Sequence, residues 1–154
     1  MDYQARLEHS PARWLAVVRF HTDLTDIGPK MAAAFANVME SLSRRDIPPT
    51  GPAVAYYQQR ADGYSAAVGF PVEGQLPDDG PVVAIQLPAT EVATITHIGR
   101  YADLPLAYDA LARQVAELGR RLDDTGGMWE EYRSPPGTPE DQTRTDVYWP
   151  LEPS

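Results

Sequence analysis

Residues 68–72 read VGFPV and residues 147–151 read VYWPL, so one pattern returns 79 positions later in the chain. Two further pairs of motifs recur in the same order at nearly the same spacing: Gly51 with Tyr56 and Gly127 with Tyr132, then Asp23-Leu24 and Asp103-Leu104. Three matches in one order predict that the chain is a duplication of a single structural unit.

Each copy has the pattern of a strand, a helix and two more strands. In the first copy, residues 13–20 form a short, valine-rich apolar run, which is typical of a buried strand. Thr25 or Asp26 can cap the helix that follows, and the runs 53–59 and 65–72 predict a hairpin. The second copy repeats this plan, and one more strand is predicted between the copies: strands at 91–98, 128–133 and 143–151, a helix after Asp103, and the connecting strand at 82–87.

The sequence therefore predicts an α+β fold built as a tandem duplication of a β-α-β-β unit. One helix can cover only one face of a small antiparallel sheet, so we expect two small sheets with one main helix each. The seam between the halves is a natural place for a ligand cleft. We expect a single domain over residues 1–154, with a first half at about 10–75, a connector at 76–90 and a second half at about 91–151.

Composition and charge exclude several functions. The chain of 154 residues has 13 Lys and Arg against 22 Asp and Glu, a net charge of −9, so no direct nucleic-acid partner is expected. Three scattered histidines and no cysteine predict neither a metal site nor a cofactor. No apolar stretch reaches the roughly 18 residues of a membrane helix, so we expect no membrane partner and a cytoplasmic location.

Several short motifs together resemble a known family over about residues 10–151. The motifs are Gly51-Pro52, GFPV at 69–72, Leu87-Pro88-Ala89, HIGRY at 97–101, WEEY at 129–132 and TDVYWP at 145–150. Their order and spacing resemble those of the GyrI-like effector-binding domains, which also form the C-terminus of multidrug-sensing transcription regulators. Arg100 and Thr90 depart from the family pattern, where a proline and a glycine are usual, and both stand at expected loop positions.

The resemblance implies a cleft that binds bulky, often cationic aromatic compounds. It also implies a glutamate, two residues before the tyrosine of the fifth strand, that contacts the positive charge of the ligand. That position is Glu130 in this sequence. The related regulators carry a DNA-binding segment, for which the ten or so residues before the first predicted strand are too few. We therefore expect a stand-alone binder.

Trp129 and Tyr132 flank Glu130 in its predicted strand, which is unusual for a carboxylate, and together with the resemblance this favours a buried Glu130. Strand side chains alternate, so Glu130 and Glu131 are expected on opposite faces, one toward a cleft and the other toward solvent. Burial would raise the pKa of the cleft carboxyl, and a cationic ligand would remove the energetic penalty. The alternative is that both glutamates lie on a solvated edge strand.

Aromatic residues are concentrated in and beside the predicted strands. A cation above such a ring gains about 0.5 to 2 kcal/mol. Tyr56 and Tyr132 are equivalent in the repeat, so we expect one on each wall of the cleft. Tyr108 falls on the apolar stripe of the second helix and is expected in the core. The predicted ligand-binding residues are Glu130, Tyr132, Tyr56, Tyr148, Tyr101 and Trp129.

Three functions are compatible with this sequence. The leading prediction is a stand-alone small-molecule (multidrug or effector) binder for a cationic aromatic compound. The first alternative is a hydrolase of strained electrophilic natural products, in which Glu130 would be the general base and Tyr132 or Tyr148 would orient the substrate. The second alternative is a gyrase-inhibitor-like protein that binds a protein partner such as gyrase or a regulator.

Overall fold

The helices and strands fall into two compact units, and the first of these is discontinuous in sequence. The computed structural model describes residues 2–23, 25–135 and 137–153, so Leu24 of the repeated Asp-Leu motif lies outside them. Unit 1 comprises residues 1–10 and 90–154, and unit 2 comprises residues 11–89. None of the helices within the described residues is long and apolar enough to cross a membrane.

Unit 2 has four antiparallel strands in the order β3-β4-β2-β5, with one long helix packed against them. The predicted hairpin is confirmed, because β3 and β4 pair along their length. Gly63 makes the turn with a φ of 136°, a conformation that a residue with a Cβ rarely adopts. The elements are β2 (Arg13–Thr22), α1 (Ile27–Arg44), β3 (Ala53–Arg60), β4 (Gly63–Val72) and β5 (Val82–Leu87).

Helix α1 begins directly after Asp26, as predicted, but Asp26 makes no side-chain capping bond. Its carboxylate instead accepts a hydrogen bond from the Thr22 hydroxyl at 3.1 Å and pairs with Lys30 at 2.9 Å. Burial therefore stabilises the helix more than its cap does. Val38 and Leu42 of α1 are fully buried in a cluster with residues of β2, β4 and β5, namely Ala16, Val72 and Val82.

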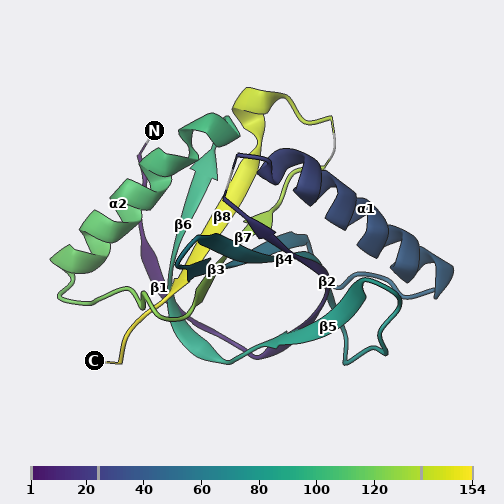
Figure 1. The fold of residues 1–154 in the computed structure, drawn as a ribbon. Coiled ribbons are helices and arrows are strands. Elements are labelled where there is room, and N and C mark those ends of the chain that lie inside the picture. Colours follow the sequence, from purple (N-terminus) through teal and green to yellow (C-terminus); the bar gives the residue numbers. More distant parts are fainter. Residues whose placement is uncertain (1, 24, 136, 154) are drawn as a thin grey trace. The chain divides into compact units, whose positions relative to one another are not determined.

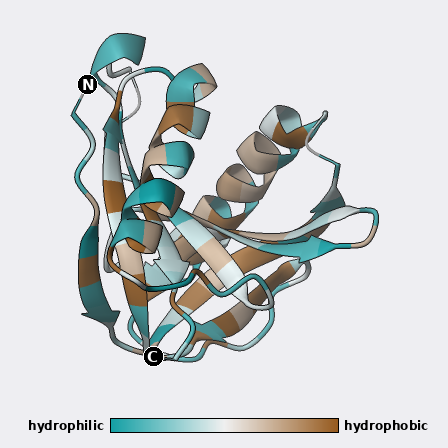
Figure 2. Ribbon diagram, turned by 90° about the vertical axis from the view of Figure 1, so that its left-hand side faces the viewer, coloured by the Kyte–Doolittle hydropathy of each residue, from teal (hydrophilic) through white to brown (hydrophobic). Residues whose placement is uncertain are grey.

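Unit 1 has four antiparallel strands in the order β1-β6-β8-β7, with α2 packed against β6. Figure 2 shows hydrophilic and hydrophobic segments alternating along α2, as expected for a helix with one buried face. The elements are β1 (Arg6–Ser10), β6 (Thr90–Ile98), the one-turn helix η1 (Tyr101–Asp103), α2 (Leu104–Glu117), β7 (Gly127–Tyr132), the one-turn helix η2 (Glu140–Gln142) and β8 (Arg144–Pro150).

The end of α2 differs from the sequence prediction. The spacing of Leu118 and Leu122 continues the apolar stripe of this helix and predicts a longer helix, but α2 ends at Glu117. Gly119 follows with a φ of 73°, and its N–H and that of Arg120 bond back to carbonyls of the last helical turn. This glycine-terminated ending leaves Leu118 exposed, so the periodicity of leucines overestimated the length of the helix.

Strand β1 was not predicted, because its sequence, RLEHS, is polar. It pairs along its whole length with β6, from Arg6 opposite Thr94 to Ser10 opposite Thr90. In Figure 1 this purple N-terminal segment lies beside the much later β6. Backbone hydrogen bonding to the edge of β6, rather than burial of an apolar face, thus places residues 6–10 in unit 1.

The prediction of two separate small sheets is wrong, because the eight strands belong to one sheet. Apolar patterns show which face of a strand is buried, but they carry no information about which edges pair. The α+β class, the two main helices and the antiparallel pairing are confirmed.

The repeat spacing of 76 between Tyr56 and Tyr132 is wrong by one residue. The strand registers align β3 with β7 at a spacing of 75, which makes Tyr57 the equivalent of Tyr132. Tyr57 lies on the α1 side of its strand, where its hydroxyl donates to Met31 of α1, so Tyr56 points to the other side. A slip of one residue exchanges the two faces of a strand, which a sequence comparison cannot detect.

Candidate functional site

Glu130 is a buried carboxyl on β7, on the face of unit 1 that packs against α2. Only 8% of the residue is exposed. The Tyr132 hydroxyl, two residues later on the same face, donates a hydrogen bond to its Oε1 atom at 2.6 Å. The Tyr108 hydroxyl, from α2, donates to its Oε2 atom. Both carboxyl oxygens are therefore held by phenols.

Glu130 forms no ion pair with a lysine, arginine or histidine within residues 2–23, 25–135 and 137–153. Burial raises the pKa of the Glu130 carboxyl, and the hydrogen bonds from Tyr108 and Tyr132 offset part of this rise. Ionised, the group is a buried negative charge without a counter-charge, which is energetically costly. Such a carboxyl can bind a cation, or it can accept a proton at a higher pH than an exposed glutamate.

Aromatic rings surround this carboxyl on the same side of unit 1. The Tyr101 ring, on η1, contacts the Tyr132 ring edge-on, with 6.0 Å between centroids. Burial and then the charge of Glu130 raise the pKa of Tyr101, although half of this residue is exposed. The Tyr108 ring contacts Trp149 edge-on at 6.1 Å. Glu130, Tyr132 and Tyr101 of the predicted set are thus brought together.

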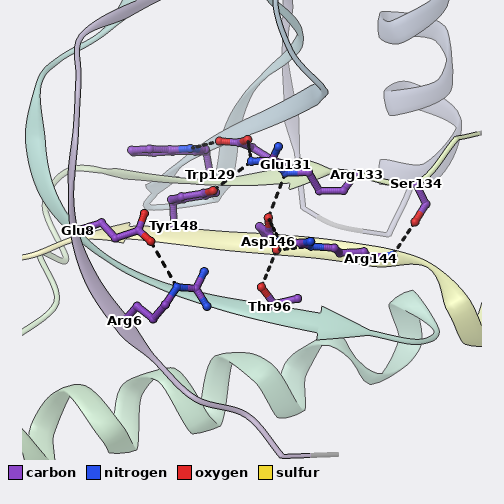
Figure 3. Close-up of polar contacts among 10 residues, drawn as sticks. All are labelled: Arg6, Glu8, Thr96, Trp129, Glu131, Arg133, Ser134, Arg144, Asp146 and Tyr148. Atoms are coloured by element: carbon purple, nitrogen blue, oxygen red, sulfur yellow. Dashed lines mark hydrogen bonds and ion pairs between the residues drawn. The ribbon is translucent and has the colours of Figure 1, made fainter.

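Trp129 and Tyr148 lie on the opposite face of unit 1. Their rings are stacked, with centroids 5.4 Å apart and an interplanar angle of 9°. Alternation along β7 places Trp129 away from Glu130, and Figure 3 shows the pair on the side of the strands away from α2. Tyr56 belongs to unit 2 and lies on the face of that unit away from α1. These three members of the predicted set are not gathered around Glu130 within unit 1.

Glu131 has a partner of opposite charge, unlike Glu130. The Arg133 guanidinium donates to its carboxylate at 2.7 Å and to Asp146 at 3.0 Å, and the Trp129 indole donates to Glu131 at 3.3 Å (Figure 3). The two glutamates do point to opposite faces, as predicted. The expectation that one faces solvent is wrong, because both residues are less than 10% exposed.

Tyr108 is the site residue that the sequence analysis assigned only to the core. It does lie on the buried stripe of α2, but its hydroxyl reaches Glu130. A buried tyrosine hydroxyl needs a hydrogen-bond partner, and this requirement was the available signal that a polar group faces the helix.

Replacing Glu130 with glutamine is expected to raise the thermal midpoint by a few degrees at pH 8 and to change it little at pH 4. The folded protein retains the Glu130 proton to a higher pH than the unfolded chain, whose carboxyl has its ordinary pKa of about 4.5. Stability is therefore lost as the pH rises above this value through the folded-state pKa, and the glutamine variant avoids the loss. Thermal unfolding at pH 4, 6 and 8 measures the difference.

Glu117→Gln is the matched control for this experiment, because Glu117 is an exposed glutamate of α2. It is expected to leave the midpoint unchanged. A Glu130→Gln variant that is less stable than the parent protein at pH 8 would contradict the absence of a counter-charge.

Comparisons with known proteins agree with the fold. The GyrI-like small molecule binding domain family matches residues 3–152. The C-terminal domain of EcmrR has 22% identity and a TM-score of 0.79, with 100% of both chains covered. The chain spans 58% of the EcmrR chain seen in a complex with DNA, with a TM-score of 0.77 and 20% identity.

Two further solved structures have the same fold. SAV2435, solved bound to tetraphenylphosphonium, has a TM-score of 0.63 and 12% identity, with 99% of this chain and 94% of that chain covered. A hydrolase from Listeria innocua has a TM-score of 0.66 and 11% identity, with 97% and 92% covered. A comparison with curated proteins finds no match. Because the family match covers nearly the whole sequence, the chain belongs to the GyrI-like small-molecule-binding domain family.

Proposed function

We propose that the protein binds bulky cationic aromatic compounds and that Glu130 supplies the charge that selects them. The observation that carries this proposal is a buried carboxyl held by two tyrosine hydroxyls and without a basic partner in the described part of the chain. A cationic ligand would provide the missing counter-charge. A neutral ligand of the same shape would not, so the protein should discriminate between them by charge.

The aromatic neighbours of Glu130 support the same chemistry. Tyr132 and Tyr101 present an edge-to-face ring pair beside the carboxyl, and ring faces attract cations. Contacts of this kind tolerate different ligand shapes, which suits a binder of more than one compound. Since Glu130 is only 8% exposed, a bulky ligand can touch it only after a neighbouring side chain moves.

The relatives also support this proposal. The family is described as a small-molecule-binding domain, and one structural neighbour, SAV2435, was solved with tetraphenylphosphonium, a lipophilic aromatic cation.

Glu130→Gln is expected to weaken binding of tetraphenylphosphonium by at least about tenfold while leaving binding of the neutral triphenylphosphine oxide within about twofold. The substitution removes the charge but keeps the side-chain shape, and loss of one partner of a buried charge pair is worth well over a factor of ten. Isothermal titration calorimetry with both ligands measures the two affinities.

Glu117→Gln serves again as the control and should bind both compounds like the parent protein. Equal weakening of both ligands by Glu130→Gln would show that the carboxyl contributes shape rather than charge. Unchanged binding of the cation would remove Glu130 from the site. Because the variant is expected to be at least as stable as the parent at neutral pH, loss of binding would not reflect unfolding.

One observation favours a second candidate, a hydrolase. A glutamate whose pKa is raised by burial is suited to act as a general base near neutral pH, and Tyr108 and Tyr132 would hold it in position. Turnover of a strained electrophilic compound that is lost in Glu130→Gln, with the tetraphenylphosphonium affinity unaffected, would favour this reading over the binding module.

A further inference from the structure

A concave surface lies in unit 2, on the face of its strands away from α1. It is a groove of about 280 Å³, which is just below the size of a pocket for a drug-sized ligand. All of its lining residues belong to unit 2, and Glu130 is not among them. Its main side chains are Arg19 and His21 of β2, Tyr56, Gln58 and Arg60 of β3, and Ser65 of β4.

The groove follows from the size of the side chains on the central strand, β4. Ala67 stands between Tyr56 on one neighbouring strand and Arg19 on the other, since it pairs with both. In the next row on this face, Ser65 stands between Gln58 and His21. Small residues in the middle and long residues on both sides produce a trough along β4. Ile85 of β5 adds an apolar contact to its lining.

The charge of the groove is opposite to that of the whole chain. The protein carries a net charge of −9, yet no aspartate or glutamate is among the described residues that line this groove. Among the residues that the structure describes, the Arg60 guanidinium bonds only neutral groups, Ser65 at 3.0 Å and Gln58 at 3.2 Å.

Arg19 forms no hydrogen bond or ion pair within the part of the chain that the structure describes, and it is exposed. In the same groove, His21 lies 3.8 Å from Asp62, whose side chain is mostly in solvent. The two arginines therefore have no carboxylate to neutralise them, while other arginines of unit 2, such as Arg44, are paired with Asp79.

We propose that this groove binds a small organic anion with a flat apolar body, such as an aromatic carboxylate. Arg19 and Arg60 bind the carboxylate, because a guanidinium donates two parallel hydrogen bonds to such a group. The apolar body lies over the small floor at Ala67, between the Tyr56 ring and Ile85. The site does not depend on the proposed function of Glu130, and it selects ligands of the opposite charge.

The test uses 2-naphthoate as the probe and 2-naphthamide as its neutral analogue, with affinities measured by isothermal titration calorimetry on the full chain. Naphthoate is expected to bind at least tenfold more tightly than naphthamide. Arg19→Gln and Arg60→Gln should each weaken naphthoate about tenfold, without an effect on the amide. Tyr56→Leu should weaken both compounds. All three substituted residues are at least partly exposed, so the thermal midpoint should stay near that of the parent.

Arg113→Gln is the matched control, since Arg113 is an exposed arginine of unit 1, and it should bind naphthoate like the parent. Binding of naphthoate that persists in Glu130→Gln supports a separate site. No naphthoate binding at millimolar concentration, or equal affinities in both arginine variants and the parent, would overturn the proposal. Tight binding of a thymidine oligonucleotide in place of naphthoate, lost in the same variants, would also overturn it and would assign the groove to single-stranded nucleic acid.

Discussion

Gly69→Ala is expected to destabilise the protein by about 3 kcal/mol or more. A Cβ at this position would lie 1.8 Å from the Ala16 carbonyl oxygen and 3.0 Å from the Val17 Cα, both backbone atoms of the neighbouring strand β2. Backbone atoms in the middle of a sheet cannot move aside as a flexible side chain does. The strands β4 and β2 would have to separate where Gly69 pairs with Val17.

Urea unfolding of Gly69→Ala measures this effect, with Gly74→Ala as its control. Gly74 follows β4 in the chain, and a Cβ there would meet nothing within 4 Å. The control should unfold at the parent's urea concentration, while the midpoint of Gly69→Ala should fall strongly. Similar midpoints for both variants would mean that β2 and β4 approach each other less closely than described.

Arg133→Met is expected to reduce the free energy of unfolding by about 2 to 3 kcal/mol. Glu131 and Asp146 are direct cross-strand neighbours on β7 and β8, a like-charge pair that is unfavourable without a cation between its members. Arg133 bridges them, at 2.7 Å and 3.0 Å. Arg144 also contacts Asp146, and Arg133 is partly exposed, so the loss should be smaller than for a fully buried pair.

Chemical denaturation again measures this loss, and two further variants test its cause. Arg113→Met removes an exposed arginine whose ion pair spans 4.0 Å, and should cost less than about 0.5 kcal/mol. Arg133→Lys should recover only part of the stability, because one ammonium group cannot bridge two carboxylates as a planar guanidinium does. Full recovery in the lysine variant would mean that charge alone, without the bridge, holds the two strands together.

The cluster around Arg133 also matters for the other face of β7. Because side chains alternate along β7, Glu131 lies on one face, where it contacts Arg133. Glu130 and Tyr132 lie on the other face, which packs against α2. Fixing β7 against β8 through Glu131, Arg133 and Asp146 therefore fixes the direction of the candidate ligand-binding carboxyl. The two adjacent glutamates have different roles, one in strand pairing and one at the candidate site.

The sequence predicted most of the elements because they follow from local patterns. The helices over residues 27–44 and 104–117 and the hairpin at Gly63 depend on apolar spacing and on a turn residue, both of which are visible in the chain. Strand β1 depends on backbone pairing with β6, 80 to 88 residues away, and its polar sequence gave no signal. Strand pairing over such a distance is a property of the assembled sheet.

The candidate site was predictable only in part, because local patterns identify some of its residues while others depend on long-range strand pairing. Glu130 was identified by family resemblance and by its aromatic neighbours, and alternation along β7 correctly separated it from Glu131. The position of Tyr148 relative to Glu130 depends on which residues pair across β7 and β8, and that register is not encoded by any single strand. Tyr108 was missed as a site residue because its helical position already explained its burial.

The origin of β1 has a consequence for synthesis. This strand is translated before β6, which begins only at Thr90, so residues 11–89 must be translated before the two can pair. All strands of unit 2 have been translated by then, whereas residues 6–10 are still an unpaired, charged segment. Long-range closure of this kind is slow. A substitution that weakens the pairing of β1 with β6 would therefore disturb a late step of assembly.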